Sequence, residues 1–71
     1  MAEFSVRHNG QPQVVGDIVR INTEGGGMQT RYLEGEAEMY VRVDDFEADA
    51  VRAVLEQRGF TVKDGLPEHE R

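Results

Sequence analysis

The sequence predicts a small α+β domain: a mostly antiparallel sheet of four to five strands with one helix packed on one face, in the order β-β-β-β-α-β. Two observations lead to this prediction. Residues 38–43, EMYVRV, alternate polar and apolar side chains, and this period of two is typical of a strand with one buried face. Residues 44–59 follow directly, with apolar side chains at helical spacing and capping signals at both ends.

The chain begins with a predicted strand. Residues 3–7, EFSVR, alternate so that Phe4 and Val6 share one face. The Asn9-Gly10 pair that follows is a strong short-range signal for a hairpin turn, because both residue types tolerate positive φ. We therefore expect the next segment to return as a second strand.

Two more strands are expected before residue 38. Residues 13–22, QVVGDIVRIN, are rich in β-branched side chains, which favours a strand, although Gly16-Asp17 could form either a bulge or a second turn. Residues 28–33, MQTRYL, are the next expected strand, and a polar connection joins them to the strand at residues 38–43.

The helix carries signals at both ends. Asp44 can cap the free N–H groups of its first turn, and Glu47, three residues later, completes the pattern of a capping box. Gly59 supplies the left-handed residue that ends a helix, and Phe60 supplies the apolar contact that accompanies it. Residues 60–63 then form a short strand, which a strand–helix–strand unit places parallel to the strand before the helix.

Helical spacing also predicts which side of this helix packs on the sheet. At 100° per residue the apolar side chains form two adjacent rows, and the charged ones gather opposite, where Arg52 and Glu56 are spaced to pair. The apolar rows consist of Phe46, Ala50 and Val54, and of Val51 and Leu55.

Length and composition favour a single domain that associates with itself. Residues 1–63 form the expected domain and residues 64–71 a flexible tail. A chain of 71 residues buries only about 60% of its unfolded surface, and the absence of cysteine rules out disulfides. One helix cannot cover both faces of a sheet, and we expect the other face to be too apolar for water. We therefore predict a homodimer through the sheet, or a partner protein on the same surface, with Tyr32, Tyr40 and Arg42 as the candidate face.

The charge balance argues against several partners. Fourteen acidic and eight basic residues give a formal net charge of −6, and the basic residues are scattered. Such a field repels phosphate backbones and anionic lipid surfaces, so we expect neither nucleic-acid nor membrane binding. The first ten residues lack the pattern of a signal peptide, and a cytoplasmic location is the default expectation.

No residue pattern predicts a catalytic, cofactor or metal site, so we expect no enzyme. Gly25–Gly27 lack the lysine and following helix of a phosphate loop, and a flexible turn is the favoured interpretation. Alternation places Glu34, Glu36 and Glu38 on one side of an extended chain, but without the neutral oxygen ligands of a calcium loop. The other isolated polar residues, His8, His69 and Ser5, lack the partners that a metal site or a nucleophile requires.

Residues 39–62 resemble the β-α-β half of ferredoxin-like regulatory modules of the ACT and GlnB-like kinds. The likeness rests on a strand ending in Asp44, a helix ending in LEQRG and a short strand. It implies dimerisation and regulation. ACT domains place Pro-Gly at a strand–helix junction that receives the ligand, where this chain has Phe46 and Glu47. The first half offers no convincing helix, so we do not expect the complete double unit.

The predicted function is therefore a non-catalytic interaction or regulatory domain that acts as a homodimer. The alternative is an ACT-like module that senses a small metabolite such as an amino acid. For that alternative, the junction at residues 43–47 and the Gly25–Gly27 loop are the places where a ligand would bind.

Overall fold

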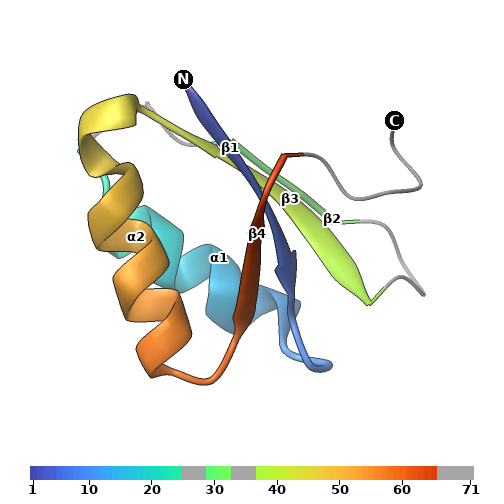
Figure 1. The fold of residues 1–71 in the computed structure, drawn as a ribbon. Helices are drawn as coiled ribbons and strands as arrows, with labels where there is room; N and C mark the ends of the chain where they lie inside the picture. Colours follow the sequence, from blue (N-terminus) through green and yellow to red (C-terminus); the bar gives the residue numbers. More distant parts are fainter. Residues whose placement is uncertain (25–28, 33–36, 66–71) are drawn as a thin grey trace.

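In a computed structural model the described residues are 1–24, 29–32 and 37–65, with residues 29–32 described by their backbone. Two helices lie on one face of a four-stranded sheet whose order is β2-β3-β1-β4, and every neighbouring pair of strands is antiparallel (Figure 1). Three of these strands, β1, β3 and β4, also have described side chains. The elements in chain order are β1 (Ala2–Arg7), α1 (Pro12–Ile21), β2 (Gln29–Tyr32), β3 (Glu38–Val43), α2 (Asp45–Gln57) and β4 (Thr61–Asp64).

The predicted order β-β-β-β-α-β with one helix is wrong, because residues 12–21 form helix α1. Its buried residues, Val15, Ile18 and Val19, are three and four positions apart, which is the spacing of one helical face. Pro12 in the first turn suits this start, since the N–H that proline lacks has no partner there. The β-branched composition favoured a strand, and burial at helical spacing prevailed over that weak preference.

The turn before α1 explains why the hairpin prediction failed. Asn9 and Gly10 do take positive φ values, 54° and 77°, as their types suggested. The chain that follows is a helix instead of a returning strand. The Gly10 N–H donates to Nδ1 of His8 at 3.1 Å, and the Gln11 N–H donates to the His8 carbonyl at 2.8 Å. A positive-φ pair therefore sets the turn without deciding the element after it.

Helix α2 ends as predicted. Gly59 has a φ of 91°, and its N–H donates to the Glu56 carbonyl, while the Phe60 N–H donates to the Leu55 carbonyl. These two bonds define a Schellman motif. The apolar rows are confirmed for Val51 and Leu55, which are fully buried, but Phe46 is 73% exposed. The expected pairing of Arg52 with Glu56 is replaced by an ion pair between Arg52 and Asp64 on β4.

Alanine substitutions at two glycines are expected to change the free energy of unfolding in opposite directions. Gly16 lies inside α1 with open space where a Cβ would sit, so Gly16→Ala should raise the free energy of unfolding by about 0.5–1 kcal/mol. Gly59 also has open space where a Cβ would sit, but its φ is positive. Gly59→Ala should therefore lower the free energy of unfolding by about 1–2 kcal/mol. Urea unfolding measures both. A loss of stability in Gly16→Ala would contradict a helix at residues 12–21.

The topology is loosely ferredoxin-like and contains two β-α-β units. The expectation that the chain lacks the complete pair of these units is therefore wrong. Strands β3 and β4 are both antiparallel to β1, which lies between them, so they run parallel to each other as expected. Helix α1 connects β1 to β2, and α2 connects β3 to β4. The ferredoxin-like arrangement therefore includes both halves of the described chain and is not limited to residues 39–62.

One apolar core lies between the sheet and the two helices. Alternate residues of the strands face it, and each helix adds its buried row. Among the described residues, no helix has the length and apolar character needed to cross a bilayer. The core consists of Phe4, Val6, Val15, Ile18, Val19, Met39, Val41, Val43, Val51, Leu55 and Phe60.

Candidate functional site

The face of the sheet away from the helices, which we call the open face, is polar and charged. Its side chains alternate with the buried set along each strand, and directly paired residues share a face. The prediction that this face is too apolar for water is wrong, because the apolar run at residues 14–21 lies in α1. The described open-face residues are Glu3, Ser5 and Arg7 of β1, Glu38, Tyr40 and Arg42 of β3, and Thr61 and Lys63 of β4.

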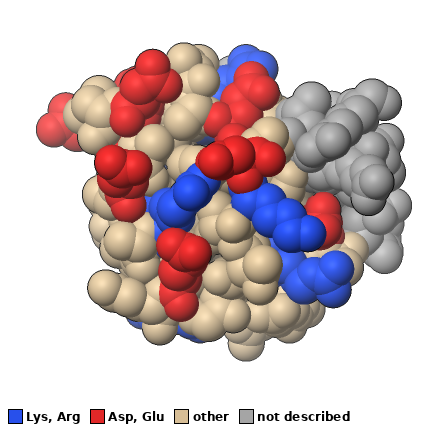
Figure 2. All heavy atoms as spheres, in the orientation of Figure 1, with Lys and Arg blue, Asp and Glu red and all other residues tan. Residues whose placement is uncertain are grey.

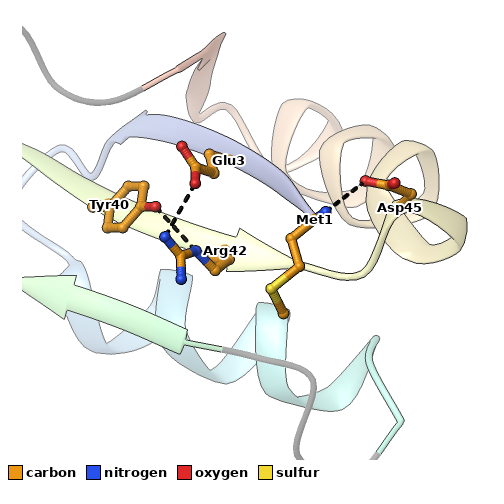
Figure 3. A network of polar contacts seen from close by, with 5 residues as sticks. All are labelled: Met1, Glu3, Tyr40, Arg42 and Asp45. Carbon is orange, nitrogen blue, oxygen red and sulfur yellow. Dashed lines mark hydrogen bonds and ion pairs between the residues drawn. The ribbon is translucent and has the colours of Figure 1, made fainter.

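Arg42 is the centre of a polar network on the open face. Its Nε donates to the Tyr40 hydroxyl oxygen at 3.2 Å, and its Nη2 donates to Glu3 Oε1 at 3.1 Å. Figure 3 shows these three side chains turned toward one another on the side of the sheet away from both helices. The guanidinium carbon also lies 5.8 Å from the centre of the Tyr40 ring. The network holds Arg42 in one orientation although about a third of its side chain stays exposed.

The same contacts act on the electrostatics of Arg42. The hydrogen bond to Tyr40 is the largest cause that raises the pKa of Arg42 above its ordinary value, and the Glu3 carboxylate raises it further. Both partners favour the charged form, because each offers oxygen lone pairs to the guanidinium. Arg42 is therefore a permanent, oriented positive charge beside an aromatic ring.

Charges alternate in sign across β1 and β3. Glu3 is opposite Arg42 at one end of the paired strands, and Arg7 is opposite Glu38 at the other, where their charged atoms are 3.9 Å apart. Along each strand the sign therefore reverses from one end to the other. Ser5 and Tyr40 form the uncharged row between these two ion pairs.

Of the predicted face, Tyr40 and Arg42 come together. Tyr32 lies in β2, where the register places it opposite Met39, and its side chain is outside the described residues. Arg31 is the β2 residue opposite Tyr40. Sequence reasoning missed Glu3, whose only sequence signal was its place in an alternating strand. Its partner Arg42 is 39 residues away, so only the strand pairing reveals the contact.

Within the described part of the chain, the other candidate residues of the sequence do not assemble into a site. Gly25–Gly27, Glu34, Glu36 and His69 lie outside the described residues. No group of three or more metal-ligating side chains occurs within residues 1–24, 29–32 and 37–65. His8, in the turn before α1, is buried at 5% exposure. Ser5 is also buried, and its hydroxyl donates to the Gly65 carbonyl at 2.7 Å, so it has a structural contact.

Glu47 is a buried carboxylate at the start of α2. Its Oε2 accepts the Glu24 N–H at 2.6 Å, and within the described part of the chain its Oε1 has no hydrogen-bond partner. The capping-box prediction is therefore wrong, since the carboxylate contacts a distant segment and Asp44 makes no side-chain cap. The bond joins the junction at residues 43–47 to the residue before Gly25–Gly27.

Fold and surface define a small β-α-β-β-α-β domain with a charged sheet face on the side away from helices α1 and α2. Acidic and basic side chains interleave near the centre of Figure 2, and acidic ones prevail over its α2 side. Comparison of the chain with protein-family models, with curated proteins and with solved structures finds no match.

Proposed function

We propose that this chain is a non-catalytic interaction or regulatory domain that acts as a homodimer through the open face. The observation that supports this most is the network of Arg42, Tyr40 and Glu3 on the sheet face away from helices α1 and α2. Arg and Tyr are the side chains that most often dominate protein interfaces. Here they are already held in place, which lowers the entropy cost of docking.

The same proposal covers location and partners. A chain of net charge −6 repels nucleic acids and anionic lipids, so a protein surface is the partner that we propose, in the cytoplasm. A small domain gains the burial that it lacks by self-association, and this favours a second copy. Because the open face is charged, we expect the dimer to be weak and to dissociate as salt increases.

Sedimentation equilibrium over a wide range of protein concentration tests this function. We expect reversible dimerisation that Tyr40→Ala weakens by about tenfold, since loss of about 1.4 kcal/mol at an aromatic contact has that effect. Arg58→Ala is the matched control, because this exposed residue follows α2 and lies outside the sheet. A chain that stays monomeric at every concentration would contradict the homodimer.

The second candidate function is an ACT-like module that senses a small metabolite. It is favoured by the bond between Glu47 and Glu24, which links the two segments where a ligand was expected. Thermal unfolding against amino acids, nucleotides and metal ions tests it. A ligand at a hundred times its dissociation constant adds about 2.7 kcal/mol, which raises Tm by about 11–22 °C in a domain of this size. Unchanged Tm values across the panel would count against this candidate.

A further inference from the structure

We propose a specific docking geometry for the homodimer: the two open faces meet with their strands aligned, and β1 of each copy lies over β3 of the other. This inference rests on the proposed function, since it specifies how the second copy binds. It follows from the positions of four charges on the two central strands and of the uncharged row between them.

The charge pattern is complementary to itself in this arrangement. A two-fold axis that runs parallel to the strands, between β1 and β3, exchanges those strands at the interface. Glu3 of one copy then faces Arg42 of the partner, and Arg7 faces Glu38 of the partner. The symmetry repeats both pairs, so four attractive contacts form without a single like-charged pair among these residues.

Sheets that cross at a right angle lose these contacts. Glu3 and Arg7 are four residues apart, which is about 13 Å along a strand, whereas neighbouring strands are only about 5 Å apart. When such sheets cross, the central strands overlap only near Ser5 and Tyr40, and the charged ends lie beyond the overlap. Aligned packing, the commoner geometry for stacked sheets, is therefore the one that uses the charges.

The uncharged row selects the direction of the axis. An axis across the strands, through Ser5 and Tyr40, also pairs opposite charges, but it places the Tyr40 ring over the Tyr40 ring of the partner. The axis parallel to the strands instead places the large side chain of Tyr40 over the small side chain of Ser5 of the partner copy. These contacts favour β1 over β3.

A double charge swap distinguishes the two axes while it preserves the pairs within each copy. In E3R/R42E the two charged open-face positions of β1, 3 and 7, are both basic, and the two of β3, 38 and 42, are both acidic. If β1 lies over β3, opposite charges still meet, and we expect the dimer to persist, although Tyr40 loses its hydrogen bond from Arg42. If β1 lies over β1, like charges meet, and dimerisation is lost. Native mass spectrometry measures the dimer, and circular dichroism verifies the fold.

A fully inverted variant, E3R/R7E/E38R/R42E, tests whether the open face is the interface at all. It should dimerise with itself but pair with the unmodified chain at least tenfold more weakly, since like charges meet in the mixed dimer. Free mixing of the two chains would overturn this geometry and leave a homodimer through another surface. A monomeric unmodified chain would overturn the proposed function itself.

The unmodified chain gives a second measurement that needs no variant to fold. In a dimer of one isotope-labelled and one unlabelled copy, intermolecular NOEs should connect the Tyr40 ring to the Ser5 side chain. Contacts from Tyr40 to the Tyr40 ring of the partner would indicate the axis across the strands. A dimer whose intermolecular contacts avoid the open face would also overturn the geometry.

Discussion

Replacement of Ile18 by alanine is expected to lower the free energy of unfolding by about 2–5 kcal/mol, the largest effect of a single substitution that we predict. Ile18 is 6% exposed and packs in the core between α1 and the sheet. The change removes buried methyl groups and leaves a cavity that the neighbouring side chains fill only in part. Because a domain this small has a total stability of only a few kcal/mol, a large fraction of the variant should be unfolded at 37 °C.

Ile21→Ala is the matched control for this prediction. It is the same substitution in the same helix, three residues further on, but Ile21 is 76% exposed. We expect its free energy of unfolding to change by less than about 0.5 kcal/mol. Urea unfolding followed by circular dichroism compares the two variants. Similar losses in both would contradict the orientation of α1 on the sheet.

Glu47→Ala should lower the free energy of unfolding by about 1.5–3 kcal/mol. Glu47 is 6% exposed, and its carboxylate accepts the Glu24 N–H, a bond between a charged group and the backbone. The variant leaves that N–H without its partner and also removes a negative charge from the first turn of α2, where the helix dipole favours it. Urea unfolding measures the loss, and faster amide exchange at Glu24 would locate it.

Two further variants separate the hydrogen bond from the charge. Glu47→Gln keeps an oxygen acceptor and loses the charge, so its loss should be smaller than that of Glu47→Ala. Asp49→Ala removes an exposed carboxylate from the same helix and should change stability by less than about 0.5 kcal/mol. Equal stability of the Glu47→Ala and Asp49→Ala variants would refute the role of Glu47 in joining α2 to the connection after α1.

The features that sequence analysis predicted well depend on neighbouring residues. Strand β3 was evident because six residues alternate, and α2 because its apolar residues and Gly59 lie within one short segment. The Schellman motif follows from the φ of a single glycine and two backbone bonds. Local steric and hydrogen-bonding rules determine such features, so the order of the residues is enough to predict them.

Helix α1 shows where local reasoning failed. Its valines and isoleucines are typical of strands, and Gly16 at its centre weakens a helix. Val15, Ile18 and Val19 nevertheless bury one helical face against the sheet, and burial of apolar area outweighs differences in propensity of less than about 1 kcal/mol per residue. The helical spacing of these three residues is present in the sequence, and it agrees with the observed element where the β-branched composition does not.

The sequence by itself determined the α+β class, strand β3, helix α2 and its C-terminal end, and the net charge that argues against anionic partners. Packing on the sheet decided between the helix and the strand that the sequence of residues 12–21 allows, and tertiary structure alone decided that Glu47 bonds to Glu24 instead of capping its own helix. It also placed Glu3 beside Arg42. The physical reason is distance along the chain: these contacts join residues 23 and 39 positions apart. Only the pairing of strands and the packing of helices on one face bring such residues together.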